Sequence, residues 1–374
     1  MKSDKTTPNV PTLRFKQYHC PWSTYHLSDI AEVVGGGTPD TTVPSLWNGD
    51  IQWFTPTEVG HQKYVSKSAR TITQLGLQKS SAKKLPAGSI LLSSRATIGE
   101  CSIAQRECTT NQGFQNLIPK NETNNEFLYY LAQTKKHHFI KYASGSTFLE
   151  ISNSEIRKTK CTVPGTEEQT QIAAFLSALD DRISVQNKII SKYETLIKGL
   201  CDMIFRHDKS ASLSDLVKCK TSALQENMVS TCPRGEYKVL GASGAIAVID
   251  TYQFDESGIL ILKDGSKAGK IQFAQGKYSV IGTSVVLIPN EACDARYLYF
   301  AMSSIDFEKY KVGSGIPHIY FKDYSNERIY YPDKALRKKI TKTLDFYETM
   351  VEIERKMLSA MQKQKAFLLQ SMFI

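Results

Sequence analysis

The residues that could carry catalysis are scattered, and none stands in a spacing that completes an active site. The segment Gly265–Lys270 (GSKAGK) resembles a phosphate-binding loop but lacks the G-x-x-x-x-G-K-[ST] spacing. Pro332-Asp333 with Glu354–Lys356 imitates the PD…ExK pattern of nucleases, yet Glu354–Lys356 falls in the middle of a predicted helix. We therefore expect no catalytic residue in this chain.

Metal ligands are no better arranged. His137-His138 is more typical of a solvated basic helix face than of a metal site. None of the eight cysteines forms a CxxC pair, which argues against a zinc ribbon or a thioredoxin-like site; they stand at positions 20, 101, 108, 161, 201, 219, 232 and 293. We expect no metal and no cofactor in this chain.

Charge and hydropathy limit the class of protein. Lys and Arg number 47 against 37 Asp and Glu, which gives a formal charge of +10 and a pI near 9.0. A polyanion such as nucleic acid is the favoured partner, although a basic protein without a polyanionic partner remains the alternative. Scattered cysteines are typical of reduced thiols in the cytoplasm. There is no apolar run of the ~18 residues that a membrane span needs, and the N-terminus lacks the apolar segment of a signal peptide.

The second half of the chain repeats the first. The matched positions lie 168 residues apart: Gly145, Ile151 and Pro164 correspond to Gly313, Ile319 and Pro332. In each copy a mixed segment of short strands and a short helix, such as the one predicted over Glu126–Tyr142, precedes a long amphipathic stretch. A repeat of this size predicts two similar globular units.

Each copy ends in an apolar seam with alternating spacings of four and three residues. This pattern predicts long coiled-coil helices from about Thr166 to Phe205 and from Lys334 to Phe373, with Thr166 and Gln169 as a capping box for the first. The seam positions are Ile172, Leu176, Leu179, Ile183, Gln186, Ile190, Ile197, Leu200, Ile340, Leu344, Val351, Glu354, Leu358 and Leu368. An isolated helix with a narrow apolar stripe is unstable in water, so we expect the two helices to pack antiparallel on each other. In that register Gln186 lies opposite Leu358, and Glu354 lies opposite Ile190.

These elements predict an α+β fold with two units in a pseudo-twofold repeat, separated by two long antiparallel helices. The predicted boundaries are a polar, frayed N-terminal tail over 1–26, a first unit over 27–165, a first helix over 166–206, a second unit over 207–333 and a second helix over 334–374.

Several segments together resemble one known family. They are Leu27–Val59 (LSDIAEVVGGGTPDTTVPSLWNGDIQWFTPTEV), Pro86–Ala104 (PAGSILLSSRATIGECSIA), Thr109–Phe114 (TTNQGF), Gly145–Ile156 (GSTFLEISNSEI) and Val163–Ile183 (VPGTEEQTQIAAFLSALDDRI). This combination resembles the specificity subunit of Type I restriction-modification systems. In the second unit, Glu236–Ile246 and Gly258–Phe273 look like another target recognition domain of the family. That unit lacks GGGTP, a counterpart of Trp47–Asp50, and the EEQ of Glu167–Gln169.

The resemblance implies a non-catalytic function in DNA recognition. Each target recognition domain would read one half of an asymmetric bipartite site in double-stranded DNA. The helices would set the spacing between the halves and dock two methyltransferase subunits. Restriction and translocase subunits would join them, and S-adenosylmethionine, ATP and Mg would be used by those partner subunits.

The candidate DNA-binding residues are polar side chains in predicted loops. They are Lys83, Lys84, Ser94, Arg95, Asn111, Gln112, Ser243, Lys263, Ser266, Lys267, Lys270, Thr283 and His318. Arg95 and Lys267 are the strongest, because small neighbouring residues allow close approach to a duplex. Asn111-Gln112 can instead be a turn that ties strands together, and Lys83-Lys84 can be ordinary surface. We expect the tryptophans at 22, 47 and 53 to lie in the core.

Two alternatives stay open. A fused restriction-modification enzyme would carry its own active site, but the N-P-P-Y-like motif of an adenine methyltransferase is absent. A coiled-coil adaptor would bind protein only.

Overall fold

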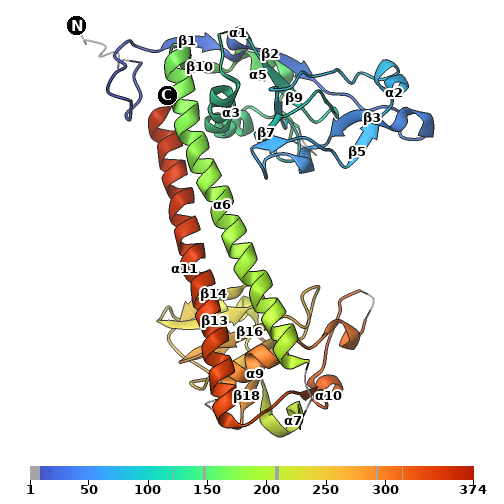
Figure 1. The fold of residues 1–374 in the computed structure, drawn as a ribbon, viewed down its shortest axis with the longest axis vertical. Coiled ribbons are helices and arrows are strands. Elements are labelled where there is room, and N and C mark those ends of the chain that lie inside the picture. Colours follow the sequence, from blue (N-terminus) through green and yellow to red (C-terminus); the bar gives the residue numbers. More distant parts are fainter. Residues whose placement is uncertain (1–8, 121, 146–148, 207–209, 292–293, 314) are drawn as a thin grey trace. The chain divides into compact units, whose positions relative to one another are not determined.

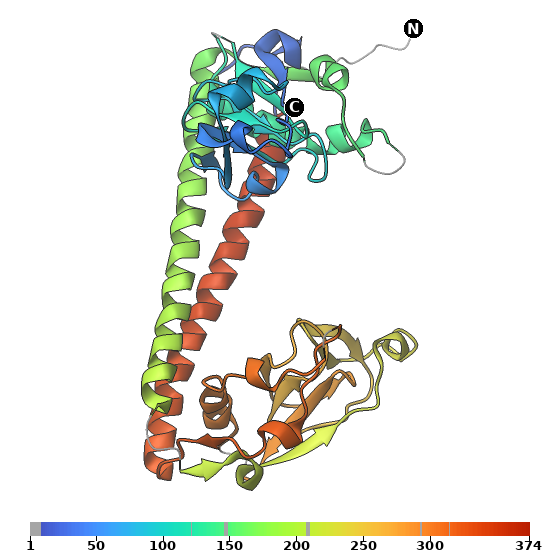
Figure 2. The same cartoon turned by 90° about the vertical axis from the view of Figure 1, so that its right-hand side faces the viewer.

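The computed structural model describes residues 9–120, 122–145, 149–206, 210–291, 294–313 and 315–374. By its contacts the chain divides into two units, Met1–Asn187 with Met357–Ile374, and Lys188–Lys356. Each unit combines twisted sheets with a short helix and with parts of both long helices (Figures 1 and 2). The predicted α+β fold class is confirmed.

Three sheets build the first unit. A five-stranded sheet has the order β2-β9-β6-β7-β4, a three-stranded sheet the order β5-β3-β8, and β1 pairs with β10. The strands are β1 (Ser23–His26), β2 (Ala31–Gly35), β3 (Trp47–Phe54), β4 (Tyr64–Val65), β5 (Arg70–Ile72), β6 (Ile90–Leu92), β7 (Cys101–Ala104), β8 (Thr109–Thr110), β9 (Gln115–Pro119) and β10 (Lys160–Val163). The helices are α1 (Leu27–Ile30), α2 (Gln74–Gln78), α3 (Asn125–Thr134), α4 (Lys136–Lys141) and α5 (Asn153–Lys158), with 3₁₀ turns at Pro44–Leu46 and Pro56–Glu58.

The second unit repeats this plan. Its sheets have the orders β12-β18-β15-β16, β14-β13-β17 and β11-β19. The strands are β11 (Ala211–Ser212), β12 (Val217–Thr221), β13 (Tyr237–Gly241), β14 (Gly244–Ile249), β15 (Gly258–Leu262), β16 (Ile271–Ala274), β17 (Tyr278–Val280), β18 (Ser284–Pro289) and β19 (Arg328–Ile329). The helices are α7 (Leu213–Leu216), α8 (Glu226–Val229), α9 (Ala295–Met302) and α10 (Phe321–Tyr324), with a 3₁₀ turn at Glu308–Tyr310. In both units the three-stranded sheet contains one parallel pair, β3–β8 and β13–β17.

Each unit has a core of its own. In the first, Phe127, Leu128 and Leu131 of α3 pack against the apolar face of β6 and β7, and all three side chains are fully buried. In the second, the corresponding helix α9 does the same with Leu298 and Phe300 against β15, whose residues are buried on both faces. Apolar burial on this scale is the main source of stability for either unit.

The long helices are α6 (Thr166–Phe205) and α11 (Lys334–Met372). In the first unit, Ile172, Leu176 and Leu179 share a buried cluster with Leu368, and Asp180 pairs with Lys365 at 2.6 Å. In the second, the end of α6 shares a cluster with Ile340 and Leu344, and Glu194 pairs with Arg355 at 2.5 Å. The start of one helix therefore packs on the end of the other, as antiparallel packing requires. The seam side chains pack against the core of their unit as well as against the partner helix.

The middle of the seam divides between the units. Ile190 and Val351 are buried in the second unit, where Glu354 is half-buried, while Gln186 is buried in the first. The predicted register places Gln186 opposite Leu358 within the first unit and Glu354 opposite Ile190 within the second, and it stays a prediction.

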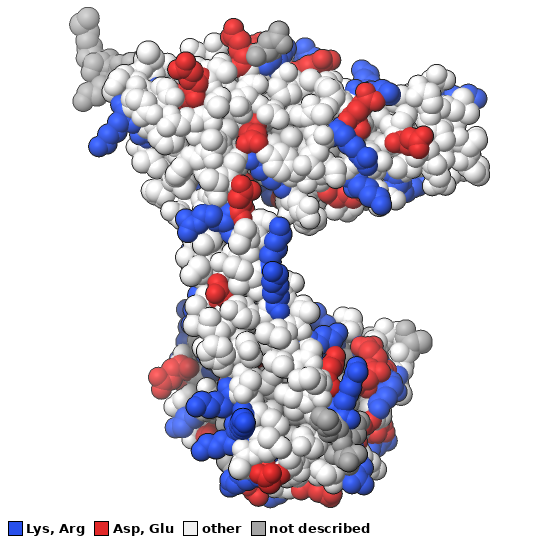
Figure 3. Space-filling model, viewed as in Figure 1, with Lys and Arg blue, Asp and Glu red and all other residues white. Residues whose placement is uncertain are grey.

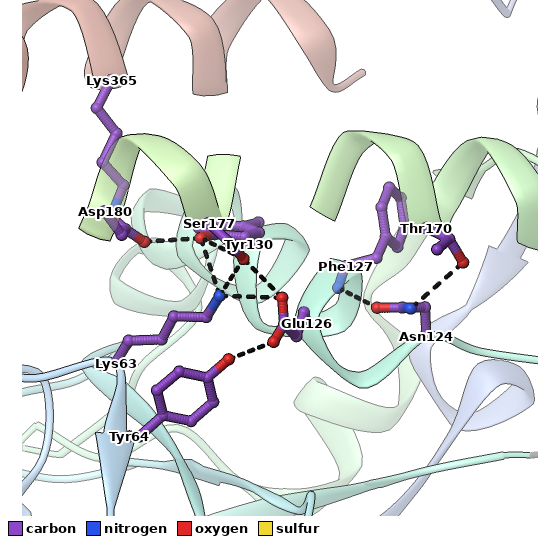
Figure 4. A network of polar contacts seen from close by, with 10 residues as sticks. All are labelled: Lys63, Tyr64, Asn124, Glu126, Phe127, Tyr130, Thr170, Ser177, Asp180 and Lys365. Carbon is purple, nitrogen blue, oxygen red and sulfur yellow. Dashed lines mark hydrogen bonds and ion pairs between the residues drawn. The ribbon is translucent and has the colours of Figure 1, made fainter. Parts of the chain in front are cut away.

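In the first unit, a polar network joins the strands and α3 to the long helices (Figure 4). Lys63 donates to Glu126, Tyr130 and Ser177. Tyr130 in turn donates to Asp180 at 2.7 Å, and Asp180 pairs with Lys365. The residue before β4 is thus joined to α3, α6 and α11 by a chain of hydrogen bonds that ends in an ion pair. The hydrogen bonds outweigh the burial that opposes ionisation, and they hold the pKa of Glu126 below its ordinary value of 4.5.

The N-terminal segment is not the frayed tail that we predicted, as far as residues 9–26 are concerned; residues 1–8 lie outside the described residues. Leu13 N donates to Ser371 O at 2.9 Å, and Trp22 is buried. Arg14 forms two hydrogen bonds with Glu168, at 2.8 and 2.7 Å. Glu168, the second glutamate of EEQ, is buried and anchors the segment that precedes β1.

The prediction of one continuous helix over Glu126–Tyr142 is also wrong in one respect. It divides into α3 and α4 at Lys135, whose φ of −88° and ψ of 0° depart from regular helix geometry. The break lets Phe139 turn into the core, where it is fully buried. Among the described residues, no helix contains an 18-residue stretch apolar enough to cross a membrane.

Candidate nucleic-acid interface

In the first unit, three loops meet at the turn between β6 and β7. Ser94 N donates to Gly113 O at 2.8 Å, and Ile151 N donates to Ser94 O at 3.1 Å. The turn is therefore held between the loop that precedes β9 and the segment that precedes α5. Arg95, the next residue, pairs with Glu150 across this junction at 2.7 Å.

The GGGTP motif brings two further loops to the same place. A Cβ on Gly36 would lie 1.9 Å from Asn111 O, and one on Gly37 would lie 2.2 Å from Ala82 N, so neither position accepts a side chain. Trp53 Nε1 donates to Gly37 O at 2.8 Å, and the Thr38 hydroxyl donates to Gln112 Oε1. The glycines thus set the loops that carry Lys83 and Gln112 next to each other.

The candidate side chains of this unit differ in their access to solvent. Lys83, Lys84 and Gln112 are exposed, and Lys84 pairs with Glu107 at 2.7 Å. Asn111 is half-buried, and its Oδ1 accepts from Gly113 N at 2.8 Å, so it shapes its own turn. Ser94 is fully buried, and its Oγ has no hydrogen-bond partner among the described residues. Its side chain therefore does not face a ligand in this conformation.

The second unit builds the same junction from different residues. Lys263 N donates to Thr283 O at 2.9 Å, Ile319 N donates to Lys263 O at 2.9 Å, and Gly265 N donates to Pro317 O at 3.0 Å. Lys263 and His318 are half-buried; the exposed candidates are Ser243, Ser266, Lys267, Lys270 and Thr283.

The hairpin loop between β13 and β14, which contains Ser243, lies beside this turn. Gln272 Nε2 donates to Gly241 O at 2.9 Å, and Lys270 Nζ donates to Ala242 O at 3.5 Å. The candidates of this unit, although far apart in the chain, are thus carried by neighbouring loops.

Two exposed cations that were not among the predicted DNA-binding residues lie against aromatic rings. Arg70 lies 3.6 Å from the ring centre of Trp47, and Lys277 lies 4.7 Å from that of Tyr252. Arg70 is the first residue of β5, and Lys277 directly precedes β17, so each lies at the three-stranded sheet of its unit. As expected, Trp47 is buried, as are Trp22 and Trp53. The stacking depends on which strands and loops are neighbours, and the local sequence does not carry that information.

On the face drawn in Figure 3, basic side chains are not gathered into one patch. Figure 3 shows Lys and Arg over both units on the face that is drawn, with Asp and Glu among them. In the described part of the chain, no cluster of three His, Cys, Asp or Glu side chains could hold a metal ion. Burial raises the pKa of the Cys101 and Cys108 thiols to about 12, so neither is a nucleophile near neutral pH.

Comparison with known proteins identifies the fold that carries these loops. The model of the Type I restriction modification DNA specificity domain matches residues 20–195 and again residues 209–362. The chain belongs to this family. The two matches correspond to the two repeats, and they confirm the resemblance that the sequence motifs carry.

Individual relatives agree. The Type I restriction enzyme MjaIX specificity subunit from Methanocaldococcus jannaschii is 41% identical over 178 residues, which are 46% of this chain and 41% of that protein. The chain thus matches less than half of that relative's length. The EcoprrI specificity subunit from Escherichia coli is 21% identical over 350 residues, 87% of each protein. The crystal structure of the S subunit from M. genitalium has a TM-score of 0.63 at 16% identity and covers 98% of this chain and 99% of its own.

Proposed function

We propose that this chain is the DNA specificity subunit of a Type I restriction-modification complex and that each recognition domain reads one half of an asymmetric bipartite site. The observation that carries the proposal is the repeated junction. In both domains a turn is held between two loops by the same backbone hydrogen bonds, and polar side chains project from it. A constant backbone with variable side chains is suited to reading different base sequences in one geometry.

The side chains at matched positions differ between the two domains, which supports two half-sites of different base sequence. The position of buried Ser94 is taken by Lys263 in the second domain, and the position of Arg95 is taken by Asp264. The turn of the second domain is one residue longer, and exposed Lys267 takes the position of Thr97, because Lys270 N donates to Lys267 O as Glu100 N donates to Thr97 O. Because donors and acceptors differ at each place, the two domains would prefer different base edges.

Exposed apolar side chains on the long helices support a docking role for them. Large apolar side chains exposed to solvent along a helix are a common feature of protein interfaces. They are Phe175, Val185, Leu196 and Met203 on α6, and Leu336, Phe346, Ile353, Met357 and Phe367 on α11. We assign these positions to two methyltransferase subunits, which would bring S-adenosylmethionine. Restriction subunits would bring ATP and Mg. The complex would act in the cytoplasm.

Methylation mapping tests the proposal. The chain is co-expressed with the methyltransferase subunits of its own system, and methylated adenines are mapped in the host genome with and without its gene. We expect methylation at a bipartite sequence with a fixed gap, and only when the chain is present. Methyl transfer by the purified chain alone would support a fused enzyme instead. An assembled complex that binds no duplex would support a protein-binding adaptor.

A further inference from the structure

An Arg–Glu ion pair and a His–Asp hydrogen bond occupy the same place in the two domains. Arg95 Nη2 lies 2.7 Å from Glu150 Oε2 in the first domain, and His318 Nδ1 lies 2.7 Å from Asp264 Oδ1 in the second. In each case the pair joins the turn after a central strand, β6 or β15, to the segment that precedes a short helix, α5 or α10. An isolated β-bridge accompanies each pair, Arg95 with Glu150 and Asp264 with His318.

The backbone establishes that these positions are equivalent. Ile151 N donates to Ser94 O, and Ile319 N donates to Lys263 O. Arg95 and Asp264 directly follow the acceptors of these bonds, and Glu150 and His318 directly precede the donors. The polarity of the pair is therefore inverted between the domains. The first domain places its nitrogen donor on the turn, whereas the second places it on the opposite segment.

Stability does not account for the pairs. The four side chains are between 31% and 43% exposed, and pairs of that kind contribute little to the free energy of unfolding because water screens them. Their geometry suits recognition better. A guanidinium has five N–H donors, so Arg95 keeps donors free for a ligand while its contact with Glu150 restrains the side chain. Asp264 orients the His318 ring through Nδ1 and leaves Nε2 to a ligand.

We propose that this inverted pair is a specificity-determining element of each domain, an inference that rests on the proposed function. Arg95 reads a guanine through O6 and N7 in the major groove, the commonest specific contact of arginine. His318 reads a base of the other half-site through Nε2. Glu150 and Asp264 are positioning residues that hold the reading side chains in place. The inversion moves the donor from one loop to another and thereby changes which base edge each domain selects.

A transplant of the pair is the sharpest test. The double substitution Asp264→Arg with His318→Glu gives the second domain the arrangement of the first. We expect the half-site read by the second domain to change at one position, in favour of guanine by roughly tenfold, as one bidentate contact allows. The other half-site and the gap stay as they are. Arg95→Ala should relax one guanine in the half-site read by the first domain, and Glu150→Gln should weaken the same preference. The readout is adenine methylation mapped with the assembled complex.

The control is a surface ion pair of the second domain that lies outside the junction. Lys220 and Glu256 are 3.0 Å apart and about half exposed, so Lys220→Glu with Glu256→Lys should leave both half-sites unchanged. If the transplanted variant does not melt cooperatively, His318→Asn replaces it as the test. We then expect one position of the same half-site to accept more than one base.

Unchanged half-sites in the transplant and in Arg95→Ala would overturn the inference. So would a loss of affinity that is equal for all sequences and reduces the salt dependence, because that is the behaviour of a phosphate contact. These outcomes differ from failure of the proposed function. In that case the unsubstituted complex would show no methylation at a bipartite sequence.

Discussion

Gln169 and Arg337 stand 168 residues apart and fasten the same two points in their respective repeats. Gln169 Nε2 donates to Pro164 O at 2.9 Å, and its Oε1 accepts from the backbone of Asn124, the residue that caps α3. Arg337 donates to Pro332 O at 2.7 Å and to both carboxylate oxygens of Asp294, which precedes α9. The glutamine of EEQ therefore has a counterpart in the second repeat, although the motif itself is absent there.

Arg337→Leu should destabilise the second unit strongly. Arg337 and Asp294 are only 9% and 5% exposed, so removal of the cation leaves an uncompensated buried carboxylate, at a cost of about 3–5 kcal/mol. Denaturant unfolding monitored for each unit measures the loss. Lys334→Ala is the control, because Lys334 is 71% exposed and its pair with Glu291 is screened. Equal stability of the two variants would contradict this account of Arg337.

Leu344→Ala and Phe346→Ala separate the buried from the exposed face of α11. Leu344 is fully buried, so truncation should cost about 2–5 kcal/mol of unfolding free energy. Phe346, two residues later, is 60% exposed, so its truncation should cost under about 0.5 kcal/mol. Under the proposed function, Phe346→Ala should weaken capture of a methyltransferase subunit in a pull-down. Full capture would remove Phe346 from the docking surface.

Glu126 should make the first unit sensitive to acid. Hydrogen bonds from Ser177, Tyr64 and Lys63 outweigh burial and lower the pKa of Glu126 in the folded state. A depressed carboxyl pKa contributes stability that is present above the unfolded value of 4.5 and is lost as the pH falls through the folded value. Melting temperatures between about pH 6 and about pH 3.5 should therefore fall further for the native chain than for Glu126→Gln. Parallel curves for the two proteins would show that the network does not depend on this charge.

Lys267→Glu should weaken DNA binding by the assembled complex. Lys267 is exposed on the longer turn of the second domain, and reversal of a cation near a phosphate reduces the slope of log affinity against log salt by about one. Titration of a duplex that contains the mapped site, at several salt concentrations, gives that slope. Lys322→Glu, in α10 of the same domain, controls for net charge. An unchanged slope would place Lys267 away from the phosphates.

Insertion of one helical turn into both α6 and α11 should lengthen the gap between the half-sites. Four residues add ~6 Å along a helix, which corresponds to about one to two base pairs. The half-sites themselves should be the same. Methylation mapping with the lengthened chain measures both. A gap of the original length would mean that the helices do not set the spacing.

Local patterns predicted the long helices, whereas contacts between distant residues stayed hidden. The alternating seam from Ile172 onward is a property of neighbouring turns, so the bounds of α6 follow from the sequence. The partners of Arg14 and Arg95 lie 154 and 55 residues away and depend on how strands and loops pack. For the same reason the N-terminal segment looked like a tail. The break at Lys135 serves the burial of Phe139, a tertiary effect that helical periodicity does not record.

The core of the first recognition domain has a consequence for synthesis on the ribosome. Phe373 stacks on Phe127 with ring centres 5.2 Å apart and meets Trp22 edge-on at 6.5 Å. Domains usually fold in the order in which they are translated. Here the first domain cannot close its core until the residues from 357 to 374 have emerged, after the second domain is already complete. Its apolar surface stays exposed during the synthesis of the whole second domain. A premature stop after Lys356 would therefore leave the first domain, rather than the second, as the substrate of chaperones and proteases.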